Sequence, residues 1–323
     1  MIIKFLNTQT KSVSFASLIL AGSYLLSAVL GLWRDRLLAG RLGTANLDVY
    51  YSAFTVPDFL ALLLIFGAIS AAIIPIFSGY LTHSKQEAWR YISNLLNIFL
   101  TILIAISVAL IIFAPLLVNL VAPGFSPEKK ELTVMLMRVM FLSPIILAIS
   151  SIVTGILQVF HRFLVGAMAP ILYNTGIIIG ILFFVPRFGL LGLAFGVVLG
   201  ATLHLLIQVP AFLFSGFAYK LQFNFRHPGV VKTLTLMVPR SLGLGAGQFN
   251  TIVTTAIAST LISGSIAIFN LANNLAAMMV HTIAASLSTA IFPPMARAFA
   301  AKDIKTFEYK FQGACSQILF LII

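Results

Sequence analysis

Long, almost uncharged apolar stretches recur along the whole chain, and they constrain its fold more than any motif does. Each exceeds the about 20 residues that an α-helix needs to cross the hydrocarbon core of a bilayer. Runs such as Asn97–Val121 lack the strict alternation of polar and apolar residues that a membrane β-barrel strand requires. The sequence therefore predicts an all-α, polytopic integral membrane protein with eight spans and part of a ninth, at 14–38, 50–79, 92–121, 132–158, 164–186, 189–215, 232–262, 265–296 and from 311 onward.

The composition supports lipid as the main solvent of this chain. Hydrophobic residues make up 60% of its 323 residues and charged residues only 9%, whereas about a quarter of the residues of soluble proteins are charged. The net charge of +12 is spread in short bands between the apolar stretches, so we expect no nucleic-acid partner. The single cysteine, Cys315, excludes a disulfide framework and a cysteine-based metal site.

The basic residues between the spans predict the orientation in the membrane. With a cytoplasmic N-terminus, the inner connections hold twelve Lys and Arg residues and the outer connections six. Because cytoplasmic loops are enriched in Lys and Arg, this bias favours an N-terminus inside the cell. Residues 1–11 lead directly into a full-length span and are read as a cytoplasmic lead-in rather than a cleaved signal peptide. The expected location is the bacterial cytoplasmic (inner) membrane, with several passes.

A weak internal repeat predicts two lobes. The pattern S-x-A-I-x-P at 70–75 recurs at 288–293, a displacement of 218 residues, which makes the seventh helix the counterpart of the first. Six helices per lobe keep both lobes in the same orientation, as in parallel-repeat transporters. We expect an N-terminal six-helix lobe at 1–231 and the start of a second lobe at 232–323. Because the chain stops in the third helix of that second lobe, we expect the sequence to be truncated and to lack the later helices of the lobe.

Several motifs, taken in order, resemble one transporter family. They are SAVLGLWRDRLLAGRLG (27–43), IPIF (74–77), APGF (122–125), FHRF (160–163) and ASTLISGSIAIFNLANNL (258–275). Together they resemble the lipid II flippase family (MurJ, formerly MviN) of the multidrug/oligosaccharidyl-lipid/polysaccharide (MOP) exporter superfamily. The resemblance implies two six-helix lobes around a central cavity. It also implies movement of an undecaprenyl-pyrophosphate-linked peptidoglycan precursor, lipid II, from the inner to the outer leaflet by alternating access.

The chain departs from the family pattern at its cationic positions. Family members typically carry cavity arginines where this chain has Ala28, Ala61 and Asn274, and an acidic residue where it has Asn273. Losing three cations from an anion site puts the particular substrate in question and leaves the fold unaffected. The sequence therefore keeps two alternatives open: a flippase for another polyprenyl-linked oligosaccharide, or a non-transporting membrane scaffold with the same fold.

Two arginines within spans are the candidate pyrophosphate ligands. Arg34 is the cation that matches the family pattern, and Arg240 follows Pro239 in the seventh span, on a helix expected to line the cavity. Arginine suits phosphate because its planar fork donates two hydrogen bonds and stays charged when desolvated. The alternative is that both side chains reach out to lipid headgroups. Asp35 and Asp48, near the outer ends of their spans, are the expected structural and charge partners.

Three asparagines of the eighth span are weaker candidates for binding the saccharide. Asn270, Asn273 and Asn274 are spaced i, i+3, i+4 and so share one helix face. Amides that faced lipid would leave their donors unmet, so this face is predicted to point inward. Hydrogen bonding to another helix is the alternative role.

Enzymatic and metal chemistry have little support in this sequence. The five histidines lie on separate elements without metal-ligand spacing, and no phosphate loop or nucleophile motif occurs. Asp58 is the one acidic residue well inside a predicted span, which disfavours a cation-drug antiporter. We therefore expect a transporter without catalytic residues, metal or cofactor. Its expected partners are a lipid-linked anionic glycan and membrane lipids, with a coupling ion or the membrane potential as energy source and an undetermined oligomeric state.

Overall fold

The regular elements of the chain are all helices in the part that the structure describes. This computed structural model describes residues 13–63, 72–278, 295 and 303–322. The chain divides into two compact units, one ending at Ala267 and the other running from Ile268 to Ile323. The helices of the first unit are α2 (Val13–Leu42), α3 (Thr44–Ala61), α4 (Ile74–His83), α5 (Lys85–Ile112), α6 (Ala114–Val121), α7 (Pro127–Met140), α8 (Leu142–Val159), α9 (Phe163–Ile179), α10 (Val185–Phe188), α11 (Leu191–Leu206), α12 (Val209–Leu213) and α13 (Pro228–Ser259).

Two further segments complete the described helices. A five-residue π-helix, Gly180–Phe184, joins α9 to α10. The helix Ser265–Met278 begins at the end of the first unit and continues into the second. The second unit also contains α15 (Ile304–Ile322), whose start is capped by the Asp303 carboxylate accepting the Thr306 N–H.

Four helical segments of the described part are long and apolar enough to cross a membrane. They are Lys85–Ile112, Pro127–Val159, Phe163–Phe188 and Leu191–Leu213. Each corresponds to a predicted span, and together they confirm the all-α, multi-span fold class. The predicted lobe boundary at residues 231 and 232 stays a prediction.

The observed helix ends differ from the predicted spans where capping residues and prolines intervene. The span predicted at 92–121 starts earlier, at Lys85, because the Ser84 hydroxyl accepts the Glu87 N–H and so caps α5. It also breaks at Phe113, where α6 begins with Pro115 in its first turn, a position that needs no N–H donor. Parts of two predicted spans, 64–71 and 279–294, lie outside the described residues.

Small residues let α9 and α11 pack closely. A Cβ atom added to Gly176 would lie 2.3 Å from the Gly200 Cα, and one added to Gly180 would lie 2.5 Å from the Gly196 Cα. Gly176 on α9 and Gly180 at the start of the following π-helix are four residues apart, as are Gly196 and Gly200 on α11. They bring the two backbones together, which is how membrane helices gain packing energy without a hydrophobic effect between them. This close helix pair belongs to the first unit, and it fixes the position of Asn174, which lies on α9.

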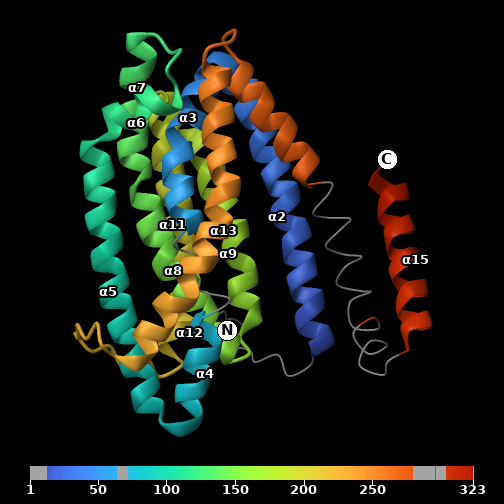
Figure 1. Cartoon of the computed structure of the whole chain (residues 1–323). Coiled ribbons are helices and arrows are strands. Elements are labelled where there is room, and N and C mark those ends of the chain that lie inside the picture. Colours follow the sequence, from blue (N-terminus) through green and yellow to red (C-terminus); the bar gives the residue numbers. More distant parts are fainter. Residues whose placement is uncertain (1–12, 64–71, 279–294, 296–302, 323) are drawn as a thin grey trace. The chain divides into compact units, whose positions relative to one another are not determined.

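The bundle of the first unit has two ends that carry different features. One end, which we call the α7 end, holds α7 and the turn after α13; the other, the α4 end, holds α4 and α12 (Figure 1). At the α4 end, a non-helical segment that follows α12 is tied to α5 by side-chain amides. The Asn94 amide exchanges hydrogen bonds with the backbone of Asn224, and the Asn97 amide donates to the carbonyls of Lys220 and Gln222. These bonds satisfy backbone groups that no helix pairs.

Candidate functional site

Arg34 lies near the C-terminal end of α2 in a polar cluster between α2 and α9. Its Nε and Nη2 atoms donate to the Asp35 carboxylate at 3.0 and 2.8 Å, and its Nη1 donates to the Asn174 Oδ1 at 2.9 Å. The side chain of Arg34 is 21% exposed and that of Asp35 12%. Three of the five guanidinium N–H groups are thus engaged in these bonds, and two remain for another acceptor.

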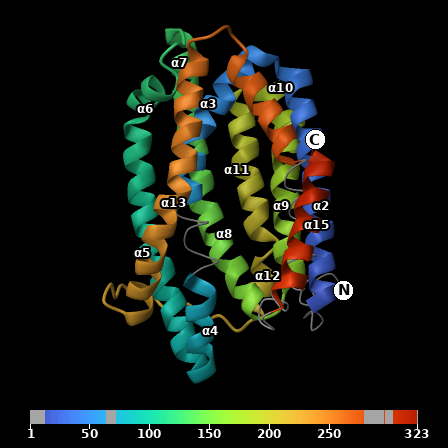
Figure 2. The same ribbon diagram turned by 45° about the vertical axis from the view of Figure 1, so that its right-hand side comes forward.

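Asn174 also bonds Ser27 on α2 and the preceding turn of α9. Its amide nitrogen donates to the Ser27 hydroxyl at 3.2 Å and to the Pro170 carbonyl at 3.3 Å. The phenol groups of Tyr50 and Tyr173 lie within electrostatic range of the Arg34 guanidinium. Helices α2 and α9 run side by side in both views of the ribbon (Figure 1 and Figure 2). The arrangement holds a cation in a fixed orientation, which suits recognition of an anionic group.

Asp48 lies on α3 at the α7 end and contacts backbone amides rather than an arginine. Its two carboxylate oxygens accept the N–H groups of Gly264 at 2.5 Å and of Ala267 at 2.8 Å. These are the unpaired donors at the start of the helix Ser265–Met278, so Asp48 caps a helix that is more than 200 residues away in the sequence. The carboxylate is only 2% exposed.

A loop after α6 reinforces this contact at the α7 end. The Gly124 N–H donates to the Ser259 hydroxyl at 3.1 Å, and the Lys129 ammonium donates to the Ser263 hydroxyl at 2.8 Å. Together with Asp48 these residues line a small pocket of about 170 Å³. The end of α13 is therefore held by α3 and by the loop before α7.

Polar contacts also join α3 to α13 further along the bundle. The Gln248 amide on α13 donates to the Asp58 carboxylate on α3 at 3.3 Å. Nearby, the Ser241 hydroxyl donates to the Leu63 carbonyl at 2.6 Å. Figure 2 shows α13 and α3 adjacent over this length. Asp58, which lies inside a predicted span, thus has an uncharged hydrogen-bond partner.

The remaining predicted ligands are Arg240 and the three asparagines. Arg240, on α13, has an exposed side chain that makes no hydrogen bond or ion pair with the described residues. Asn270, Asn273 and Asn274 lie on one face of the helix Ser265–Met278, in the second unit. Asn270 and Asn274 are half-buried and each interacts with another residue, whereas Asn273 is exposed. The structure therefore brings Arg34 and Asp35 together and places Asp48 in a separate contact.

The partners of these residues were the part that sequence reasoning missed. Neither the pairing of Asn174 with Arg34 nor that of Asp58 with Gln248 was predicted. Both pairings join residues more than 100 positions apart. Their signal in the sequence is weak: each is a polar side chain inside an apolar stretch, which is expected to face a partner.

Comparisons with known proteins agree with this fold and with the motifs at 27–43 and 258–275. The sequence model of the family described as "Lipid II flippase MurJ" matches residues 39–323. A lipid II flippase MurJ of Burkholderia cenocepacia is 29% identical over 298 residues, which are 89% of this chain and 58% of that protein. A probable lipid II flippase MurJ of Buchnera aphidicola is 30% identical over 298 residues, 88% of this chain and 57% of that protein. The chain thus spans less than two thirds of the length of these relatives.

Solved structures give the same picture. A structure described as "Lipid II flippase MurJ, inward closed conformation" aligns with a TM-score of 0.79 at 26% identity, covering 94% of this chain and 63% of that one. An inward-facing transporter of the multidrug resistance MATE family aligns with a TM-score of 0.69 at 18% identity, covering 94% of this chain and 68% of that one. At this identity the likeness supports the fold alone. The fold is that of the MOP superfamily, the protein is a multi-pass membrane protein, and the chain belongs to the lipid II flippase MurJ family.

Proposed function

We propose that this protein moves lipid II, the undecaprenyl-pyrophosphate-linked peptidoglycan precursor, from the inner to the outer leaflet of the cytoplasmic membrane. It does so as a transporter rather than an enzyme. Family membership supports this, since relatives that carry the name cover nearly the whole chain. The proposed orientation has the N-terminus in the cytoplasm, the α4 end inside and the α7 end outside.

The observation that carries the proposal is the held guanidinium of Arg34. Asp35 and Asn174 fix its plane and leave two N–H groups for a ligand. A pyrophosphate offers oxygens at the spacing that an arginine fork pairs with, and it competes for the guanidinium with the Asp35 carboxylate. Asp35 then keeps the site neutral when no substrate is bound, since an unpaired charge at membrane depth is costly.

Arg240 and the three asparagines are the further candidate ligands of this proposal. Arg240 is exposed on α13, so its guanidinium is available to a second phosphate oxygen. Asn270, Asn273 and Asn274 offer amide donors and acceptors on one helix face, which suit the hydroxyl and acetamido groups of a saccharide. The family resemblance implies arginines at the positions of Ala28, Ala61 and Asn274, so we propose that Arg34 bears more of the pyrophosphate recognition here.

The contacts of Asp48 support an alternating-access mechanism. In this state the capped start of the helix Ser265–Met278 and the Gly124 and Ser259 contact close the α7 end of the first unit. Opening toward the outside requires these hydrogen bonds to break, and they are few enough to reform in each cycle.

The test is complementation of bacteria depleted of their own lipid II flippase. The protein should restore growth and the exposure of lipid II on the outer leaflet. Arg34→Gln should lower that exposure about tenfold or more, because hydrogen bonds to charged groups contribute about 1.5–3 kcal/mol. Arg34→Lys keeps the charge but loses the planar fork, and should retain an intermediate exposure.

The matched control is Arg36→Gln, which removes an exposed arginine two residues away. It should leave lipid II exposure unchanged. If the unmodified protein is inserted and abundant but restores nothing, lipid II is not its substrate. If Arg34→Gln works as well as the unmodified protein, Arg34 does not bind the pyrophosphate.

A further inference from the structure

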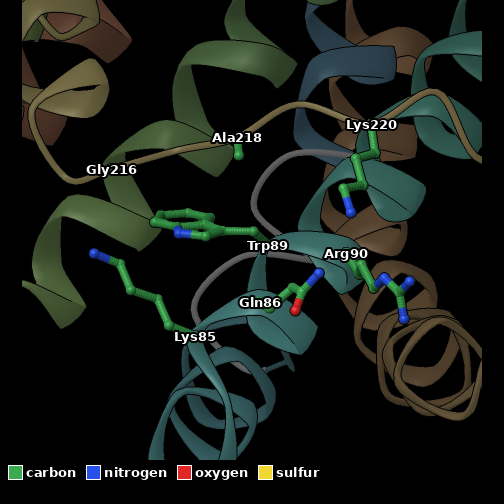
Figure 3. A pocket seen from close by; sticks show the side chains of 7 residues that line it. All are labelled: Lys85, Gln86, Trp89, Arg90, Gly216, Ala218 and Lys220. Atoms are coloured by element: carbon green, nitrogen blue, oxygen red, sulfur yellow. The ribbon is translucent and has the colours of Figure 1, made fainter.

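A basic pocket lies at the α4 end, away from the cluster around Arg34. Its volume is about 300 Å³, and it opens between the first turn and a half of α5 and the segment that follows α12 (Figure 3). Helix α5 contributes Lys85, Gln86, Trp89 and Arg90; the segment contributes Gly216, Ala218 and Lys220. The transport cycle described above makes no use of these residues.

The pocket carries an excess of positive charge. Lys85, Arg90 and Lys220 line it, and Glu87 is the acidic residue beside them, where it forms an ion pair with Arg90 at 2.8 Å. Among the described residues, the ammonium groups of Lys85 and Lys220 have no hydrogen bond or ion pair. In the close view these two ammonium groups lie on opposite sides of the pocket, at either side of Trp89 and Gln86 (Figure 3). Two lysines are thus left to neutralise an anion.

The backbone around the pocket adds to this preference. The pocket lies at the N-terminus of the 28-residue helix α5, where the helix dipole favours negative charge. Gly216 has a positive φ of 83°, and a Cβ atom there would lie 2.9 Å from the Lys85 Nζ. The turn after α12 therefore leaves space that the Lys85 side chain occupies.

Trp89 gives the pocket an apolar wall with a polar edge. Its indole packs against Phe77, Phe160 and Phe217, with ring centroids 5.2, 5.9 and 5.3 Å away. The indole is 4% exposed, and its Nε1 has no hydrogen-bond partner among the described residues. A buried indole N–H usually finds an acceptor, so a donor is left over beside the two lysines.

The depth of the pocket identifies the source of the anion. By length and composition, one candidate membrane span begins at Lys85 and another ends at Leu213, so both walls of the pocket lie at the ends of candidate spans. That is the level of the lipid headgroups, where Lys, Arg and Trp are the usual anchors. An anion bound there by basic residues between transmembrane helices is most simply a headgroup phosphate.

We propose that this pocket binds the phosphate of an anionic glycerophospholipid such as phosphatidylglycerol. Lys85 and Lys220 neutralise the phosphate, the N-terminus of α5 faces it, and the acyl chains lie against α5 in the bilayer. A zwitterionic lipid is disfavoured because its choline or ethanolamine cation would meet the same lysines. This proposal is independent of the substrate that the protein transports.

The indole in the pocket can report its own occupancy. The chain has two tryptophans, and Trp33→Phe leaves Trp89 as the single emitter. This protein is reconstituted into phosphatidylcholine bilayers that contain phosphatidylglycerol brominated on the acyl chain near the headgroup, or brominated phosphatidylcholine. Quenching of Trp89 then gives the relative affinity for the two lipids.

Phosphatidylglycerol should quench Trp89 at several-fold lower mole fraction than phosphatidylcholine does. Lys85→Gln and Lys220→Gln should each lower that preference about fivefold, in proportion to one lost cation near a membrane surface. Lys85→Arg keeps the charge and should retain the preference. The matched control, Lys232→Gln, removes an exposed lysine from the first turns of α13, and should change nothing.

Three outcomes would overturn the proposal. Equal quenching by both lipids would show that the pocket does not select an anionic headgroup. An equal loss in Lys232→Gln would show that the preference comes from the general surface charge. A change in Trp89 emission on addition of millimolar inorganic phosphate, in the absence of quenching by the brominated lipid, would identify a site for the free anion instead.

Discussion

The Asp48 carboxylate accepts a hydrogen bond from the Ala267 backbone N–H at 2.8 Å, across 219 positions of sequence. The second carboxylate oxygen accepts the Gly264 N–H, so one buried side chain satisfies two donors at the start of the helix Ser265–Met278. Gly264 has a positive φ of 102°, as Gly43 has one of 71° before α3. The two joints meet, because Thr44 after the first joint lies against Gly264 of the second.

Replacing Asp48 should weaken this contact measurably. Asp48→Ala leaves two buried N–H groups without an acceptor and should lower the free energy of unfolding by about 1–3 kcal/mol for each unpaired group that stays buried. Asp48→Asn retains one acceptor oxygen, so its free energy of unfolding should lie between those of the unmodified protein and Asp48→Ala. The midpoint of thermal unfolding in detergent micelles measures the effect. Asp303→Asn alters an exposed, local cap of α15 and serves as control; an equal shift in that variant would contradict the importance of the long-range cap.

A side chain at Gly264 should disturb the same joint. Gly264→Ala places a Cβ atom 2.7 Å from the Thr44 Oγ1 and 2.9 Å from its Cβ, in a backbone conformation that L-residues rarely adopt. We expect a loss of stability of about 1–3 kcal/mol, read as a lower midpoint of thermal unfolding. Gly243→Ala is the control, because that glycine lies inside α13 with no neighbouring atom within 4 Å of an added Cβ. Equal midpoints for the two variants would refute the constraint at Gly264.

The cluster around Arg34 predicts an effect of Asn174 on both stability and transport. Asn174→Ala removes the Oδ1 acceptor of Arg34 and the donor to Ser27, and should lower the free energy of unfolding by about 1–3 kcal/mol. Because the guanidinium loses its orientation but not its charge, transport should fall less than in Arg34→Gln. Lipid II exposure and the unfolding midpoint are measured on the same preparations. Thr175→Ala, which removes a local bond to the Ile171 carbonyl only, is the control; if it matches Asn174→Ala, the cluster has no special role.

His227 predicts a pH dependence at the α4 end. Its Nδ1 accepts the Gly229 N–H and caps α13, which requires the neutral ring. Burial lowers the pKa of His227 below its usual value, and the nearby Glu87 carboxylate partly offsets this. Because the folded pKa lies below the unfolded one, the stability from this cap is present above about pH 6.5 and is lost as the pH falls through the folded pKa.

The measurement compares unfolding midpoints between neutral and mildly acidic pH. The unmodified protein should lose more stability on acidification than His227→Asn does, since asparagine caps a helix without titrating. If both proteins respond to pH alike, the pH dependence does not arise from His227.

Close packing of α9 and α11 gives a last prediction. Gly196→Ala places a Cβ atom 2.8 Å from the Gly180 Cα, which is backbone and cannot move aside cheaply. The helices must separate, and the unfolding midpoint should drop by an amount equivalent to about 1–3 kcal/mol. Gly31→Ala on α2, with open space around an added Cβ, should leave the midpoint unchanged or raise it. A similar midpoint for both variants would mean that this contact is not tight.

The sequence by itself determined the class of this protein and most of its helices. Long apolar stretches are a local signal, and they predicted the four described segments that are long and apolar enough to cross a membrane. Capping by Ser84 and the break before Pro115 shifted the ends of one of them. The motifs around Arg34 and at 258–275 were sufficient for the family. Only the tertiary structure decided the partners: Asn174 for Arg34, Ala267 for Asp48, and Lys220 opposite Lys85. These pairs depend on which helices pack together and on how each helix is rotated about its axis. Hydropathy reports only that a segment is buried in lipid or protein, so it cannot predict these contacts.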